Sequence, residues 1–232
     1  MRPQSKRYRA LAEKRSEEPL SIRDAVVKLK EYANTKFDQT VDCVIRLGID
    51  PKQADQLVRG SISLPKGIGK ARRVIVFCPD EQVDQAKKAG AVEAGADDLI
   101  KKVQDGWMDF DVAIAVPQIM SKVSRLGRLL GPQGKMPSPK TGTVTADFVK
   151  AVGEYAAGKV EFRNDAGGNV HTVVGKLSFS EEDLVSNIEF FLEHIRRLRP
   201  ATAKRTYLRQ IFLSGSMSPS VAVVVAEKHE HV

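Results

Sequence analysis

The hydrophobic pattern changes twice along the 232-residue chain, and this limits the folds that the chain can adopt. Residues 40–48 alternate between apolar and polar side chains, which is typical of a strand with one exposed face. Residues 73–78 and 111–116 are instead continuously apolar, as expected for short parallel strands that helices cover on both faces. The alternating pattern returns toward the end of the chain, at residues 159–163, 170–179, 207–213 and 221–225.

Helix signals support the same division. Ser21 precedes an apolar repeat of helical spacing, and Ser180 precedes a longer one that Pro200 ends. Between the buried strands, helices are expected at residues 80–89, 96–103, 118–130 and 145–157. Residues 1–20 are basic and lack periodicity, which predicts a flexible arm.

We therefore expect a mixed α/β and α+β protein of two domains. Domain I is discontinuous and comprises residues 1–66 and 159–232, whereas domain II is an α/β insert over residues 67–158. Glycine-rich turns absorb backbone rotation, so Gly67, Gly69 and, on the return segment, Gly158 are expected hinge residues. A single large sheet is the alternative that the pattern leaves open.

The charge is basic and unevenly distributed. The chain has 37 Lys and Arg against 29 Asp and Glu, a net charge of +8. Bases occupy acid-free stretches at residues 56–79, 122–140 and 196–209, whereas residues 80–111 are rich in acids. Such segregation favours binding to a polyanion, above all nucleic acid, over a solvated surface of mixed sign.

Several other classes of protein are not expected. The longest apolar runs are far shorter than the roughly 20 residues of a membrane-spanning helix, and no apolar stretch follows Met1. Cys43 and Cys78 lie in apolar strand-like runs and outside any zinc-ligand pattern, so we expect buried, reduced thiols, with one disulfide arithmetically possible.

No catalytic constellation is present either. The four histidines are His171, His194, His229 and His231, and none belongs to a known catalytic or metal-binding motif. The Gly67-x-Gly69-Lys70 segment lacks the remaining residues of a phosphate-binding loop or a dinucleotide fingerprint. We therefore expect a protein that is not an enzyme, with no catalytic residue, no metal site and no cofactor.

Three loops are better suited to RNA. The first carries Lys36, Phe37, Gln39 and Thr40, in which an aromatic ring can stack on a base beside cationic and polar groups. The alternative for Phe37 is a core position just before the strand. The second, residues 213–220, has small hydroxyl residues that permit close backbone approach, or is a plain hydrophilic turn. The third, residues 164–171, indicates only a hairpin by itself.

Five segments carry a family resemblance in addition. They are KFDQTVDCVIRLGID at residues 36–50, ADQLVRG at 54–60, LPKGIGK at 64–70, GRLLGPQGKMPSPK at 127–140, and Gly175-Lys176. In this order and spacing they resemble the bacterial large-subunit ribosomal protein L-one family, the protein of the lateral stalk. The resemblance runs over about residues 8–228.

The resemblance implies a fold and a site. Domain I would be a split β-α-β domain that carries the main RNA site, and domain II a Rossmann-like three-layer insert without a dinucleotide. The implied RNA-binding residues are Lys36, Phe37, Gln39, Thr40, His171, Ser216, Met217 and Ser218. The family's usual loop reads Thr-Met-Gly-Pro, so Ser218 adds a side chain where glycine lets the backbone approach RNA closely.

The resemblance also implies partners. They are large-subunit (23S) rRNA at the mobile lateral stalk, tRNA in the ribosomal exit site, and the mRNA of the protein's own operon. The implied roles are as a structural part of the large ribosomal subunit, in release of deacylated tRNA, and in repression of translation of that operon. The chain would be cytoplasmic, on the ribosome, a monomer when free, and without contact to membranes.

Overall fold

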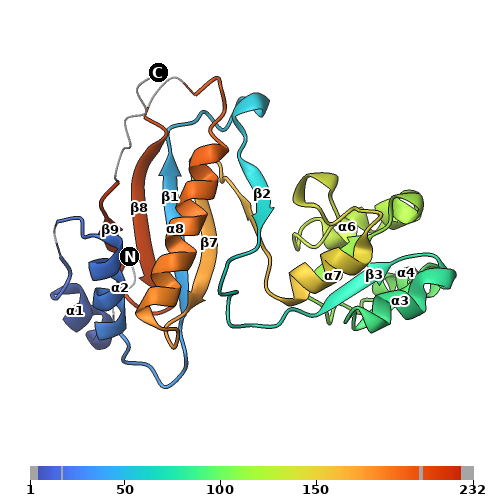
Figure 1. Cartoon of the computed structure of the whole chain (residues 1–232), viewed down its shortest axis with the longest axis horizontal. Coiled ribbons are helices and arrows are strands. Elements are labelled where there is room, and N and C mark those ends of the chain that lie inside the picture. Colours follow the sequence, from blue (N-terminus) through green and yellow to red (C-terminus); the bar gives the residue numbers. More distant parts are fainter. Residues whose placement is uncertain (1–4, 17, 204–205, 226–232) are drawn as a thin grey trace. The chain divides into compact units, whose positions relative to one another are not determined.

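A computed structural model describes residues 5–16, 18–203 and 206–225 (Figure 1). Arg2, Lys204, Arg205, His229 and His231 therefore lie outside the described residues. The chain forms two compact units. Unit 1 contains the described residues of Met1–Val58, Leu64–Gly69 and Phe162–Val232, and unit 2 contains Arg59–Ser63 and Lys70–Glu161.

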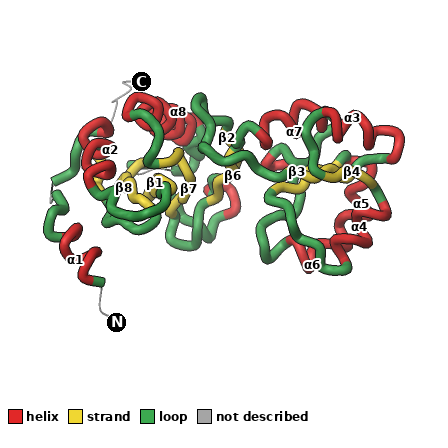
Figure 2. The backbone as a smooth tube through the Cα atoms, turned by 90° about the horizontal axis from the view of Figure 1, so that it is seen from below, coloured by secondary structure: helices red, strands yellow, loops and turns green. Residues whose placement is uncertain are grey.

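Unit 1 is an antiparallel sheet covered by helices on one face. The strand order is β7 (Asn169–Lys176), β1 (Thr40–Leu47), β8 (Leu208–Gly215) and β9 (Val221–Val223). The helices α2 (Ile22–Glu31) and α8 (Glu181–Arg197) pack together on the same side of these strands (Figure 2). Both begin where the sequence predicts, because the hydroxyls of Ser21 and Ser180 accept backbone hydrogen bonds at their N-termini.

The alternation of β1 places the core on the helix side of this sheet. Val41, Cys43 and Ile45 are fully buried, and so is an apolar stripe of α8. That stripe consists of Leu184, Ile188, Phe191, Leu192 and Ile195. Successive strand residues point to opposite faces, so Thr40, Asp42 and Val44 lie on the other face of the sheet, which we call the open face.

Unit 2 is a three-layer α/β unit. Its parallel strands have the order β4 (Glu93–Gly95), β3 (Val74–Phe77) and β5 (Val112–Ala115). Val74 and Val76 pack with α3 (Val83–Lys88) and α7 (Phe148–Ala156). Ile75 and Phe77 pack on the opposite side, with residues of α4 (Asp97–Gln104), α5 (Met120–Val123) and α6 (Gly127–Leu130) (Figure 2).

The mixed α/β and α+β fold class is confirmed, and the single-sheet alternative is wrong, because the described strands form three sheets. The third sheet pairs β2 (Arg59–Ile62) with β6 (Val160–Arg163). Single 3-10 turns join several elements; they are Ala54–Gln56, Asp80–Gln82, Pro117–Ile119, Ser124–Leu126 and Pro139–Thr141.

Two local expectations were wrong. The basic arm contains a helix, α1 (Lys6–Ala12), which Ser5 caps by accepting a hydrogen bond from the Tyr8 amide. The helix expected over residues 118–130 is instead a series of short α and 3-10 turns. Its buried side chains follow a helical spacing, but Gly127 and Gly131 weaken a continuous helix.

The glycine turn between β2 and β3 is fixed to unit 1 by a buried asparagine. Asn187 on α8 accepts a hydrogen bond from the Lys66 amide at 3.1 Å. Its Nδ2 donates to the carbonyl oxygens of Gly67 and Val174, at 3.0 and 2.8 Å. Gly67 and Gly69 have φ values of 63° and 70°, a left-handed conformation that glycine adopts without steric cost.

Candidate nucleic-acid interface

Two loops from opposite ends of the sequence meet at one end of the unit 1 sheet. The first leads from α2 into β1, and the second joins β8 to β9. The register pairs Thr40 with Lys176 and Val41 with Gly215, so the start of β1 lies between the end of β7 and the end of β8. Of the residues implied by the resemblance, all but His171 belong to these two loops and their flanks.

The buried side chain of Gln39 connects the two loops. Only 1% of this residue is exposed, and its Oε1 accepts a hydrogen bond from the Met217 amide at 2.9 Å. A Cβ atom at Gly215 would lie 2.9 Å from that oxygen, so glycine at residue 215 leaves room for the Gln39 side chain in its present position. Gln39 therefore supports the second loop and does not present its side chain to solvent.

A second set of hydrogen bonds fixes the same junction. The Ser216 hydroxyl accepts from the Thr40 amide at 3.2 Å, and the Ser216 amide donates to the Thr40 carbonyl at 3.1 Å. Lys176 donates from Nζ to the Thr40 hydroxyl at 2.8 Å. The loops are thus held together before any ligand arrives, which lowers the entropy lost on binding.

Ser218 turns its hydroxyl inward. Its Oγ accepts a hydrogen bond from the Gly215 amide at 2.8 Å, so the side chain closes the turn in which it lies. The side chain that Ser218 adds to the loop therefore stabilises the turn by an internal hydrogen bond.

Each of the two loops also carries an exposed apolar side chain. Phe37 is 52% exposed and Met217 is 49% exposed, and Lys36 beside Phe37 is exposed as well. The alternative interpretation of Phe37 as a core residue is therefore wrong. Asp38 holds the first loop in place, because its carboxylate accepts hydrogen bonds from the amide and the hydroxyl of Ser178, at 3.1 and 2.8 Å.

His171 lies apart from the loop junction but on the same open face. It pairs with Val44 on β1, four residues along the strand from Thr40. At about 3.3 Å per residue this separation is roughly 13 Å. His171 Nε2 lies 3.5 Å from Oδ2 of Asp165 in the hairpin before β7.

Lys176 and Asp42 complete this face, although neither was among the expected site residues. Asp42 lies on the open face between the Thr40 and Val44 positions. Burial raises the pKa of its carboxyl, and the nearby charges of His171 and Lys176 lower it in part. The alternation of β1 was sufficient to place Asp42 on the face that Thr40 shares; the role of Lys176 depends on a strand pairing that periodicity alone does not predict.

The described part of the chain contains no cluster of three or more His, Cys, Asp or Glu side chains that would hold a metal ion. Cys43 and Cys78 are buried free thiols, and burial raises the pKa of the Cys43 thiol to about 12. No helix among these residues has the length and hydrophobicity needed to cross a bilayer.

Comparison with known proteins identifies the family of the chain. A model described as "Ribosomal protein L1p/L10e family" matches residues 29–219, which include the first loop, the second loop as far as Pro219 and the whole of unit 2. The chain belongs to this family. Membership of a family of ribosomal proteins confirms the resemblance and the expectation that the chain is not an enzyme.

Curated relatives of the L1p/L10e family match nearly the whole chain. A "Large ribosomal subunit protein uL1" of Cutibacterium acnes is 52% identical over 220 residues, 94% of this chain and 95% of the relative. Proteins of the same name from Nocardioides sp. and Chlorobaculum tepidum are 49% and 47% identical, again over 94% of this chain and over 92% and 95% of those proteins.

Proposed function

We propose that the chain is an RNA-binding component of the large ribosomal subunit, on the cytoplasmic ribosome, and that the loop junction of unit 1 binds large-subunit rRNA. One observation carries the proposal. Phe37 and Met217 are exposed on two loops that hydrogen bonds through Gln39, Thr40 and Ser216 hold together. The curated relatives are named as proteins of the large ribosomal subunit, which supports the same assignment.

The geometry favours recognition of RNA by shape. The major groove of an A-form helix is too deep and narrow for side chains, so proteins read sugar hydroxyls, the backbone path and unstacked bases. An exposed ring such as Phe37 stacks on a base, and the flexible thioether of Met217 fits against an irregular apolar surface. Lys36 beside them supplies attraction to phosphate, which salt weakens.

In this proposal the eight residues have different roles. Lys36, Phe37 and Met217 contact RNA directly, together with the exposed Ser216 and, further along the open face, His171. Gln39, Thr40 and Ser218 act mainly as positioning residues, because their side chains hydrogen-bond within the two loops or to Lys176. RNA specificity then depends on these positioning residues as well as on the residues that contact RNA.

The proposal extends to two domains that move relative to one another. Domain I comprises residues 1–66 and 159–232, and domain II comprises residues 67–158. Rotation would occur at Gly67, Gly69 and Gly158, all of which have positive φ values. Such motion would accompany release of deacylated tRNA from the exit site, and binding to a similar structure in the operon's mRNA would repress its translation.

Titration of the full chain with an in vitro transcript of the lateral-stalk region of large-subunit rRNA tests the assignment. Phe37→Ala and Met217→Ala should each weaken binding by roughly 1–3 kcal/mol, which is typical of a lost stacking or buried contact. Phe190→Ala is the matched control, because Phe190 is 43% exposed on α8, away from both loops, and should leave the affinity unchanged.

A shuffled transcript of equal length separates this function from that of a generic RNA chaperone. The ribosomal assignment requires the chain to prefer the folded stalk RNA. Equal affinity for both transcripts would favour the chaperone, and unchanged affinity of both the Phe37 and Met217 variants would remove the loop junction from the interface.

A further inference from the structure

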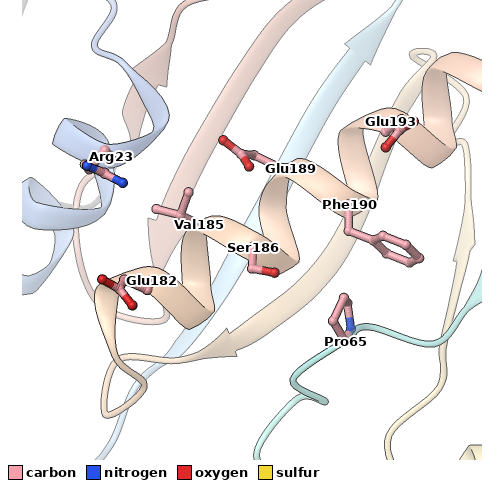
Figure 3. A pocket seen from close by; sticks show the side chains of 8 residues that line it. All are labelled: Arg23, Pro65, Glu182, Val185, Ser186, Glu189, Phe190 and Glu193. Carbon is pink, nitrogen blue, oxygen red and sulfur yellow. The ribbon is translucent and has the colours of Figure 1, made fainter.

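One face of the helix α8 is buried against the sheet, and the opposite face is not. The stripe from Leu184 to Ile195 is buried in the core of unit 1. The other face carries a second stripe, which we call the outer stripe, in which the apolar side chains of Val185 and Phe190 alternate with polar ones (Figure 3). Its residues are Glu182, Val185, Ser186, Glu189, Phe190 and Glu193. Phe190 lies on this outer stripe with 43% of its surface exposed.

The outer stripe lines a shallow groove of about 460 Å³. Arg23 of α2 lies on one side of the groove, and Pro65 lies on the other, on the side of Phe190 (Figure 3). Val185 adds a further apolar side chain. All of the lining residues belong to unit 1, so the groove is a feature of this unit alone.

The charge of the groove is opposite to that of the whole protein. Three carboxylates, those of Glu182, Glu189 and Glu193, line it against the single cation Arg23, whereas the chain carries a net charge of +8. Glu193 pairs with Arg197. Glu182 and Glu189 form no ion pair with any residue that the structure describes, so both are available to an external cation.

We propose that this groove, which we call the α8 groove, binds an arginine-rich segment of another protein. A guanidinium group can interact with both kinds of side chain in the groove, the aromatic ring and the carboxylates. An arginine side chain can stack on the exposed ring of Phe190 while it forms paired hydrogen bonds with a carboxylate such as Glu189. Val185 and Pro65 then contact the apolar part of the same segment.

The acidic lining argues against RNA as the occupant. Phosphates would lie against the unpaired carboxylates of Glu182 and Glu189, and like charges repel. The α8 groove also lies on the helix side of the sheet, whereas His171 and Thr40 occupy the open face. RNA and a basic protein segment can therefore bind unit 1 at the same time.

Size sets the length of the probe. Residues 182 to 193 span eleven helical steps, about 17 Å at 1.5 Å per residue, which five or six residues of extended peptide cover. The probe is a labelled heptapeptide, Arg-Ala-Arg-Leu-Arg-Ala-Arg, titrated into the full chain at low salt. Two comparison peptides replace every arginine by lysine or by glutamate.

Fluorescence anisotropy should give the tightest binding for the arginine peptide, binding at least threefold weaker for the lysine peptide, and none for the glutamate peptide. The double variant Glu182→Lys, Glu189→Lys should weaken the arginine peptide at least tenfold, and Phe190→Ala about threefold. The matched control Glu81→Lys, Asp84→Lys makes the same charge change at exposed acids of unit 2 and should retain binding.

Amide shifts of the labelled protein locate the peptide. Changes concentrated at Val185, Ser186 and Phe190 support the proposal. Equal binding to the two double variants, or shifts confined to other surfaces, would overturn it. Self-association of the free chain that Glu189→Lys abolishes, measured by sedimentation, would assign the groove to a second copy and also overturn it. None of these outcomes depends on whether the loop junction binds rRNA.

Discussion

Gln39 accepts a hydrogen bond from the Met217 amide at 2.9 Å, across 178 positions of the sequence. The bond is made by a side chain that is almost completely buried. One end of the chain therefore determines the shape of a loop at the other end. The surface that carries Phe37 and Met217 exists only when both ends have folded together.

Replacing Gln39 by methionine tests this relationship. Methionine has a similar volume but no oxygen, so the Met217 amide loses its acceptor and the second loop its support. Loss of this one hydrogen bond should make the free energy of rRNA binding less favourable by about 1 kcal/mol, which is roughly fivefold weaker binding. Titration of the stalk transcript measures it. Gln104→Met, at an exposed position of α4, should bind as the wild type does.

Ser218 offers a second test of the braced loop. Ser218→Ala removes the acceptor of the Gly215 amide and should lower the free energy of unfolding by roughly 0.5–1.5 kcal/mol, with a parallel loss of RNA affinity. Ser220→Ala lies in the same loop, and Ser220 makes no side-chain hydrogen bond within the described chain. If the two variants gave the same urea midpoint and the same RNA affinity, the hydrogen bond between Ser218 and the Gly215 amide would contribute nothing measurable to stability or binding.

Periodicity and caps predicted much of this molecule. Ser21 and Ser180 marked the starts of α2 and α8, and the change from alternating to continuous apolar runs separated the sheet of unit 1 from the sheet of unit 2. These signals are local, because a cap or a period depends on residues within a few turns of one another.

The internal organisation of the site was beyond such reasoning. Gln39 is polar and lies in a loop, so the sequence favours an exposed contact residue. In the structure its side chain is buried and hydrogen-bonds the Met217 amide, 178 positions away. The contact between Lys176 and Thr40 likewise depends on which strands pair. Helix α1 was missed because it buries a single apolar side chain, Leu11, and so lacks a periodic signal.

Asn187 should be important for the stability of unit 1. Asn187→Ala leaves the Lys66 amide and the carbonyls of Gly67 and Val174 without their partner, and each unsatisfied buried group costs roughly 1–3 kcal/mol. Urea unfolding should therefore begin at clearly lower concentration. Asn34→Ala is the control at an exposed position. An unchanged midpoint for Asn187→Ala would show that water replaces these bonds without cost.

Asp165 should give unit 1 a local dependence on pH. Hydrogen bonds from the Asn169 side chain and amide, and from the Gly167 amide, lower the pKa of this carboxyl to about 2. Because the folded pKa lies below the unfolded value of about 3.9, the stabilisation is present above pH 4 and is lost as the pH falls through 2.

The amide signals of Gly167 and Asn169 report this titration by NMR. Their shifts should move with a midpoint near pH 2, and Asp165→Asn should abolish the step. A midpoint near pH 4 in the wild type would mean that these hydrogen bonds do not favour the ionised carboxylate.

Photo-crosslinking of the chain to RNA in a cell extract, with the attached RNA sequenced and the crosslinked peptides identified, tests the central claim most directly. If the loop junction binds large-subunit rRNA, the attached RNA comes mainly from one folded region of that rRNA, and the crosslinked peptides contain Phe37 and Met217. RNA drawn evenly from many transcripts, or crosslinks that avoid both loops, would contradict it.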